Sequence, residues 1–176
     1  LLINININSS NLGYDKNVDK IVEQSNSPFV WFLGCGERIA PDSIRIITEE
    51  IQNNMDLTNI VLNFDIYNES NKKFSRKELI LDENIFIFGG ENFSLERYSS
   101  AMSANIVSKT KWLEASNNSL HVEGWCHVER ISEMILKKNS ASLVIKESCF
   151  TLYRESKGWW FHPRAHEIVM NHLEVI

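Results

Sequence analysis

The chain has 176 residues, of which 43% are hydrophobic and 23% are charged, and its formal net charge is -5. This length and apolar content are sufficient for one folded domain with its own core, and they exclude a disordered chain. The acidic balance argues against nucleic-acid binding, because phosphate contacts need clustered Lys and Arg side chains.

The first half of the chain alternates predicted strands with predicted helices. Apolar residues alternate with polar ones, or run continuously, in the segments 1–8, 29–33 and 59–64, which predicts three strands. Apolar residues recur at helical spacing in the segments 14–22 and 41–51, which predicts two helices. This order of elements is typical of an α/β domain with a largely parallel sheet.

The second half of the chain is less regular. The polar and basic residues 65–81 predict a surface loop or a hairpin. Further elements predicted from apolar patterns are a strand over 103–107, helices over 109–115 and 125–135, strands over 142–145 and 150–153, and a last helix from Pro163. Glu133 and Lys137 are expected to form an ion pair on one helix face, and the last two strands to pair across 146–148. No repeat or linker divides the chain, so 1–176 is expected to be a single domain.

Polar residues that follow predicted strands are candidates for a binding site, because ligands of open α/β sheets bind at the carboxyl ends of strands. Glu37 follows the buried strand 29–33 and two glycines, Gly34 and Gly36, which would let the backbone approach a ligand closely. A carboxylate there could hold Mg²⁺ or Mn²⁺, which prefer oxygen ligands. The alternative is an ordinary strand-to-helix turn with a solvated Glu37.

Three segments in this order carry a resemblance to a known family: NLGYDKN at 11–17, WFLG at 31–34 with a helix opening at Pro41, and SANIV at 103–107 with KWL at 111–113. Together they resemble the inverting family 2 glycosyltransferases with the GT-A fold. The resemblance extends from Asn11 to about Trp160. It implies a Rossmann-like, mostly parallel sheet flanked by helices.

The chain departs from the family at two places. The first strand–helix–strand unit of the family, which usually holds the nucleotide base, is not recognisable before Leu1, so the domain is expected to lack that unit. Since the chain starts inside an apolar run without Met, we expect that it lacks the N-terminal part of a longer protein. Where the family has a D-x-D-type motif, this chain has Cys35, Gly36 and Glu37, which leaves Glu37 as the one carboxylate ligand.

The resemblance implies transfer of a sugar from a nucleotide-diphosphate donor to an acceptor hydroxyl with inversion, in bacterial surface polysaccharide synthesis. The acceptor would be a glycan or a lipid-linked glycan, and the enzyme cytoplasmic or peripheral to the inner membrane. The basic stretch 72–77 could contact anionic lipid headgroups or be a solvated loop. Mg²⁺ or Mn²⁺ on Glu37 would stabilise the departing diphosphate. The alternative function is a non-catalytic domain of the same fold that binds a sugar or a partner protein.

The family's motifs also imply roles for individual residues. The implied donor-binding residues are Asn11, Gly13, Asn17, Gly34, Cys35 and Gly36. Glu123 matches the first acid of an E-D pair that supplies the catalytic base, although Gly124 replaces the second acid. His127 is the second candidate, because it lies one helical turn further on the same face and has a suitable ordinary pKa. The alternative for Glu123 is a surface helix start.

Aromatic residues are the implied acceptor-binding set, because their faces stack against sugar rings. They are Trp112, Trp125, Trp159 and Trp160. A late histidine can complete the metal site in related enzymes, which makes His162 a candidate ligand. Equally, His162 could belong to the start of the last helix, with at least one of the two late Trp residues in the core.

The three Cys residues are irregularly spaced and form no disulfide framework, which indicates a reducing compartment. Cys126 lies close in sequence to His121 and His127, and Cys35 could join them at a zinc ion. The spacing matches no paired zinc-ligand pattern, so a zinc site is the weaker hypothesis.

Overall fold

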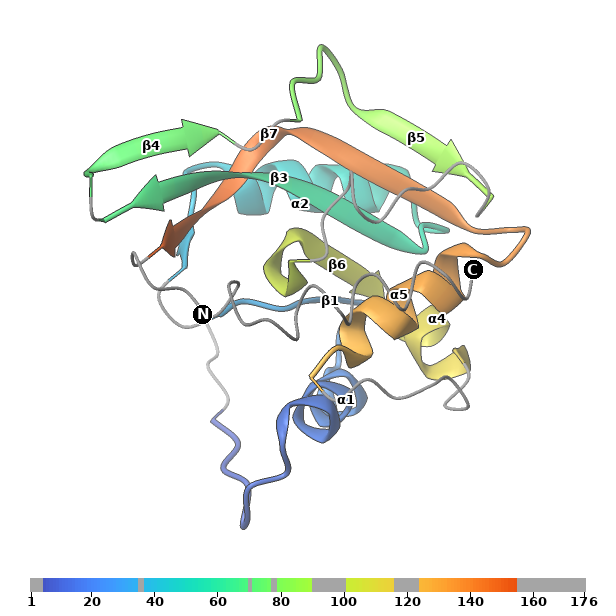
Figure 1. Ribbon diagram of the computed structural model, residues 1–176. Helices are drawn as coiled ribbons and strands as arrows, with labels where there is room; N and C mark the ends of the chain where they lie inside the picture. Colours follow the sequence, from blue (N-terminus) through green and yellow to red (C-terminus); the bar gives the residue numbers. More distant parts are fainter. Residues whose placement is uncertain are drawn as a thin grey trace, which may run out of the picture.

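The computed structural model describes residues 5–34, 37–69, 71–76, 79–89, 101–115 and 124–154. Within them, seven strands form one curled sheet, and helices cover both of its faces (Figure 1). The fold is therefore mixed α/β, as the sequence predicts. None of the described helices is both long enough and apolar enough to span a bilayer.

The strands are β1 Phe29–Trp31, β2 Arg38–Ile39, β3 Asn59–Asn68, β4 Lys73–Arg76, β5 Ile85–Phe88, β6 Asn105–Ser108 and β7 Ala141–Arg154. The helices are α1 Tyr14–Gln24, α2 Ser43–Asn53, α4 Lys109–Glu114 and α5 Cys126–Ile135, with a short 3-10 turn, η2, at Met102–Ala104. The strand order is β1-β6-β3-β7-β2, with β4 beside β3 and β5 beside β7.

The prediction of a mostly parallel sheet is wrong for the described residues. β3 and β7 pair in parallel, but the other five described strand pairs are antiparallel. The reason is that β6 runs between β1 and β3 in the opposite direction. β1, β3 and β7 consequently share one direction, and we call the end towards which they run the carboxyl end of the sheet and the other its amino end.

Among the described residues, two of the three hydrophobic cores pack helices against the sheet. On one face, α1, α4 and α5 pack against β1 and β6 around Val22, Trp112 and Ile131. On the other face, α2 packs through Ile47 against a set that includes the stacked rings of Phe64 and Phe150. Each such side chain contributes about 1.5–3 kcal/mol when fully buried, so these contacts hold the helices against the sheet.

The predicted helices at 14–22, 41–51, 109–115 and 125–135 are confirmed, as are the strands that became β1, β3 and β6. The predicted strand over 1–8 is not formed in its described part, residues 5–8, where Ile5 and Ile7 are 81% and 89% exposed. An alternating pattern needs a neighbouring strand to bury its apolar side, and 5–8 has none in the described sheet.

The last two predicted strands are one long strand, β7, and do not pair with each other. Its pairing with β3 shifts register on either side of Asn63, where extra residues of β7 bulge out. The Asn63 amide fills the gap by donating to the carbonyl oxygens of Leu79 and Lys146, at 3.0 and 2.9 Å.

Lys137 does not form the expected ion pair with Glu133. Its ammonium lies 4.0 Å from a carboxylate oxygen of Glu114 on α4 instead. The predicted helix from Pro163 lies outside the described residues.

Candidate functional site

The Glu37 carboxylate is held at the carboxyl end of β1. Its Oε2 accepts a hydrogen bond from the backbone N–H of Gly34 at 2.7 Å, and its Oε1 accepts one from the Ser103 hydroxyl at 2.6 Å. The backbone N–H of Glu37 also donates to the Gly34 carbonyl at 3.3 Å, which closes the turn. An ionised carboxylate has about four acceptor positions, so two bonds fix its orientation and leave capacity for a cation or a donor group.

Gly34 lets the Glu37 carboxylate approach the backbone closely. A Cβ at Gly34 would lie 3.3 Å from both Cδ and Oε1 of Glu37, closer than most real contacts of that kind. The sequence predicts that glycine here lets the backbone come close to a ligand. Among the described residues, the group that lies close to the Gly34 backbone is the Glu37 carboxylate. Cys35 and Gly36, predicted to bind the donor, lie outside the described residues.

The short turn η2 connects Glu37 to the other predicted site segments. The Ser103 carbonyl accepts a hydrogen bond from the Trp31 indole N–H at 2.8 Å, while its hydroxyl holds Glu37. The preceding residue, Met102, accepts a hydrogen bond at its sulfur from the Tyr14 hydroxyl at 3.0 Å. Two consecutive residues of η2 therefore tie the end of β1 to the start of α1.

The start of α1 contains the predicted donor-binding residues Asn11, Gly13 and Asn17. The Asn11 side-chain oxygen accepts from the Gly13 N–H at 3.0 Å, and Gly13 has a φ of 76°, which favours glycine. The Asn17 side-chain oxygen accepts from the Asn8 amide at 2.8 Å. In the structure the segment is an ordered turn that opens the helix, and the side chain of Asn17 ties it to Asn8.

The start of α5 is fixed by Asp15 of α1. One oxygen of the Asp15 carboxylate accepts the Gly124 N–H at 2.9 Å, and the other accepts the Cys126 N–H at 3.2 Å. A carboxylate at this position caps the helix and lies at the positive end of its dipole. Glu123, the predicted base, lies outside the described residues, but the next residue, Gly124, is held by this cap with a φ of 87°.

His127 is brought to the same place. Its Nδ1 lies 2.9 Å from the Tyr14 hydroxyl, and its ring stacks at 18° on Trp125 with the centroids 5.9 Å apart. Only 6% of His127 is exposed. Burial, with smaller contributions from the nearby Cys126 and Asp15, raises the pKa of the Tyr14 hydroxyl far above its usual range, so Tyr14 stays protonated beside His127.

Trp112 and Trp125, predicted to bind the acceptor, are packed inside the protein. Trp112 is 2% exposed, its indole N–H donates to Asp19 at 2.9 Å, and its ring lies 5.5 Å from that of Phe32. Trp125 is 8% exposed. The structure therefore gives both indoles a packing role, because a sugar ring needs an accessible aromatic face. Trp159, Trp160 and His162 lie outside the described residues.

Within the described residues, no three His, Cys, Asp or Glu side chains are grouped closely enough to hold a metal on their own. Glu37 is a single carboxylate, and Mg²⁺ is commonly held by one or two carboxylates together with substrate phosphates. A metal at the carboxyl end would therefore have Glu37 as its one ligand from the predicted set within the described residues. Burial raises the pKa of the Cys126 thiol, which disfavours the thiolate that zinc needs.

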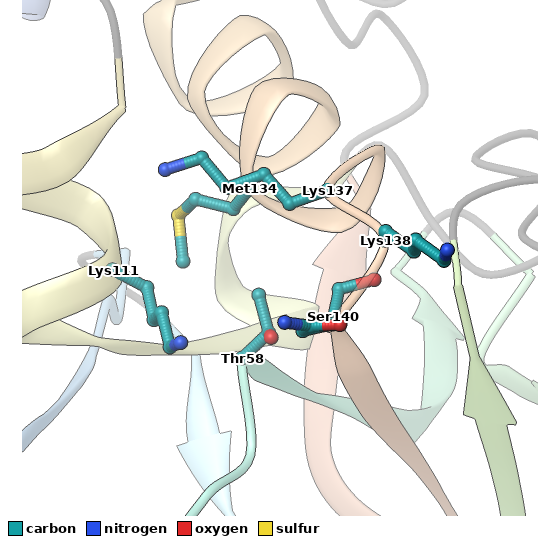
Figure 2. A pocket seen from close by; sticks show the side chains of 7 residues that line it. Thr58, Lys111, Met134, Lys137, Lys138 and Ser140 are labelled. Atoms are coloured by element: carbon teal, nitrogen blue, oxygen red, sulfur yellow. The ribbon is translucent and has the colours of Figure 1, made fainter.

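A hollow of about 210 Å³ lies at the amino end of the sheet (Figure 2). Its lining residues are Thr58, Lys111, Met134, Lys137, Lys138, Asn139 and Ser140. Thr58 and Ser140 use their hydroxyls in the fold: Thr58 accepts from the Ala141 N–H at 3.1 Å, and Ser140 donates to the Ile135 carbonyl at 2.5 Å. The lining contains no acid or histidine and none of the predicted site residues.

The sheet and its helices match solved structures of a glycosyltransferase, and the chain therefore shares the fold of the part of that enzyme that it matches. The matching structures are those of S. aureus TarS 1-349. TarS 1-349 has a TM-score of 0.61 at 12% identity, and the match covers 84% of this chain and 42% of the TarS chain. The complex of TarS 1-349 with UDP-GlcNAc has a TM-score of 0.61 at 10% identity, and the match covers 83% of this chain and 40% of the TarS chain. The complex with UDP has a TM-score of 0.58 at 11% identity, over 81% and 40%.

The chain spans about two fifths of the TarS chain that it matches. No protein-family model matches the sequence, and no curated protein matches it. At these identities the likeness concerns the fold alone.

Sequence reasoning identified the segments that meet at η2 but missed the side chains that join them. The apolar pattern predicts a helix that includes Tyr14 and Asp15 and a strand that includes Ser103, and it predicts no contact for any of the three. The one available signal was that all three lie inside or beside the segments that resemble the family. Nothing in the local sequence indicates that Ser103 would reach a carboxylate so distant in the chain.

Proposed function

We propose that this chain belongs to an inverting glycosyltransferase of the GT-A, family 2 type, which transfers a sugar from a nucleotide-diphosphate donor to an acceptor hydroxyl. The observation that carries the proposal is the Glu37 carboxylate, held by Gly34 and Ser103 at the carboxyl end of β1. The glycosyltransferase fold supports it, and one of the matching structures was solved with UDP-GlcNAc. We take the same class of donor for this chain.

In the proposed reaction, the acceptor oxygen bonds to the anomeric carbon of the donor while the bond from that carbon to the diphosphate oxygen breaks. The nucleoside diphosphate leaves, and the acceptor's proton passes to a base. Glu123 is our first candidate for that base; it directly precedes Gly124, whose backbone N–H is held by Asp15. His127 is the second candidate, although its burial leaves little of its surface for an acceptor.

We also propose that Glu37 would hold Mg²⁺ or Mn²⁺ together with the donor diphosphate. When bound, the ion would supply the positive charge that a departing diphosphate needs. The residues of the chain prepare this site in advance: Ser103 and Gly34 fix the carboxylate, and Trp31 fixes Ser103. A site whose ligands are already oriented loses less entropy when the ion and donor bind.

The proposed setting is bacterial surface polysaccharide synthesis, at the cytoplasmic side and in peripheral contact with the inner membrane, with a glycan or lipid-linked acceptor. A non-catalytic domain of the same fold is the second candidate function. The presence of Cys35 and Gly36, where the family has acidic residues, favours that candidate. Turnover of the donor separates the two, since a binding domain releases no nucleotide.

Calorimetric titration of the full-length protein with UDP-GlcNAc, with and without Mn²⁺, tests the proposal. We expect Mn²⁺ to strengthen binding and Glu37→Gln to weaken it at least about 30-fold, since the variant removes a charge from the site. Glu49→Gln is the matched control, because Glu49 is an exposed carboxylate that pairs with Arg45 on α2. Absence of binding by the wild-type protein would contradict the donor assignment.

Release of UDP from UDP-GlcNAc tests catalysis without a known acceptor, because water can replace the acceptor slowly. Glu123→Gln is expected to abolish release and to leave donor binding unchanged. Release that survives in Glu123→Gln but is lost in His127→Gln would move the base to His127. Donor binding without any release in the wild-type protein would favour the non-catalytic candidate.

A further inference from the structure

Three aromatic side chains form a row across neighbouring strands near the carboxyl end of the sheet. Tyr67 of β3 is in register with Phe74 of β4 on one side and with Tyr153 of β7 on the other. The ring centroids are 4.7 Å apart for Tyr67 and Phe74 and 5.3 Å apart for Tyr67 and Tyr153. Residues that pair directly across strands share a face of the sheet, so the three rings lie side by side. We call them the aromatic row.

The rings of the aromatic row are open to a ligand. They are tilted by 55° and 56° to each other, so none covers the full face of its neighbour. Phe74 is 67% exposed, and Tyr67 and Tyr153 are half-buried. An aromatic side chain that stays exposed loses about 1.5–3 kcal/mol of the stabilisation that full burial would give. Contiguous exposed apolar groups often mark interaction sites.

The row lies on the face of the sheet that α2 does not cover. Phe64 and Ile66 of β3 point into the core on the α2 side, and side chains alternate along a strand, so Tyr67 points to the other face. The guanidinium of Arg38 lies over the Tyr153 ring, 5.0 Å from its centroid. This cation–π contact adds hydrogen-bond donors at one end of the row.

The row is close in the fold to the proposed donor site. Arg38 directly follows Glu37 and is in register with Thr151, two residues before Tyr153. β1, β3 and β7 run towards the same end of the sheet, where β4 also lies in Figure 1. A molecule lying along the row could thus extend towards the strand end that carries the Glu37 carboxylate.

We propose that the aromatic row, with Arg38, binds the sugar rings of a glycan acceptor; this rests on the proposed glycosyl transfer. The C–H faces of sugar rings pack on aromatic faces, and the hydroxyls of Tyr67 and Tyr153 and the Arg38 guanidinium are available to sugar hydroxyls. The row takes over the acceptor contact that the sequence assigns to Trp112 and Trp125, which are buried.

A lipid surface is the competing occupant, because Lys72 and Lys73 precede Phe74. Each Lys or Arg near an anionic membrane contributes about 1 kcal/mol, so attraction depends on the net charge of the segment. Asp65 and Glu69 lie on the same hairpin and offset two of its positive charges. The hairpin is therefore only weakly basic, whereas two of the three rings in the row carry a hydroxyl, which favours a sugar.

Saturation-transfer NMR with maltohexaose, cellohexaose and chitohexaose tests the proposal, because it detects weak contacts with sugar ring protons. Phe74→Ala is expected to weaken binding of the best of these probes about tenfold, the loss of one stacking partner. Phe88→Ala is the matched control: it removes the same side chain with the same 67% exposure, from β5 at the amino end of the sheet. The control should bind like the wild-type protein.

Three results would overturn the proposal. The first is that the wild-type protein gives no saturation-transfer signal with any of the three oligosaccharides, and the second is an equal loss of oligosaccharide affinity in Phe74→Ala and Phe88→Ala. The third is that sedimentation with phosphatidylglycerol vesicles depends on Phe74 while oligosaccharide binding does not. UDP-GlcNAc binding is measured on the same samples. Oligosaccharide binding that depends on Phe74 without any UDP-GlcNAc binding would support the row and reject the proposed function. The reverse pattern would reject the row and keep the function.

Discussion

The two ends of the sheet differ in what their polar groups do. At the carboxyl end, two donors hold the Glu37 carboxylate in place and leave part of it free to accept a further ligand. At the amino end, Lys111, Lys137 and Lys138 surround a hollow, but the hydroxyls in its lining are used in joining the strands and helices (Figure 2). A hollow alone therefore does not make a site; an oriented, chemically capable group is needed as well.

The same contrast applies to the exposed aromatic residues. Phe86 and Phe88 of β5, at the amino end, stack on each other at 12°. The aromatic row at the carboxyl end instead has tilted rings and an arginine beside it. Phe74 and Phe88 are equally exposed, and the row has the Arg38 guanidinium over one of its rings.

The largest effect on this comparison is expected from Gly34→Ala. The added methyl group would lie 3.3 Å from the Glu37 carboxylate and shift it from its present position, which should weaken UDP-GlcNAc binding about tenfold to a hundredfold. Calorimetric titration measures this. The melting temperature should change little, because the turn is at the surface. Unchanged donor affinity would show that the orientation of Glu37 is unimportant.

A pair of serine variants gives a smaller and more specific effect. Ser103→Ala removes a hydrogen bond to the Glu37 carboxylate, and bonds to charged groups contribute about 1.5–3 kcal/mol, so donor affinity should fall about tenfold. Ser140→Ala removes a buried hydrogen bond at the amino end and should lower the melting temperature without changing donor affinity. Equal donor affinities in the two variants would remove the distinction between the ends.

The smallest effect is expected from Lys111→Ala and Lys138→Ala, which remove positive charge from the hollow. Donor affinity should stay within about twofold of the wild-type value, since exposed charges contribute about 0–1 kcal/mol and these lie at the opposite end of the sheet. Titration with UDP-GlcNAc is again the measurement. A large loss in either variant would place the diphosphate at the amino end.

Much of the fold could be predicted from the sequence because helices and buried strands are encoded locally. The stripe of α1 around Val18 and Val22 and the apolar run of β1 are present in the chain itself and were predicted correctly. The direction of β6 could not be predicted in this way, because its antiparallel place between β1 and β3 depends on partners far away in the sequence. The bulge in β7 depends on Asn63 of another strand for the same reason.

The candidate site was predictable to a smaller extent. The order of the motifs and the strand ending before Glu37 led to the carboxylate, but composition could not distinguish a buried Trp112 from an exposed one. Phe74 lay in a segment predicted only as a polar loop or hairpin, so its pairing with Tyr67 was not foreseen. The burial of Trp112 and the pairing of Phe74 with Tyr67 both depend on which side chains face each other across strands or helices. The sequence could not predict them, because these contacts arise only in the tertiary structure.

The most direct test of the account is the titration of wild-type protein and Glu37→Gln with UDP-GlcNAc in the presence of Mn²⁺. If the oriented carboxylate beyond β1 is the feature that binds the donor, the wild-type protein binds and the variant loses at least about 30-fold in affinity, while Glu49→Gln does not. Equal affinities for the wild-type protein and Glu37→Gln would contradict it.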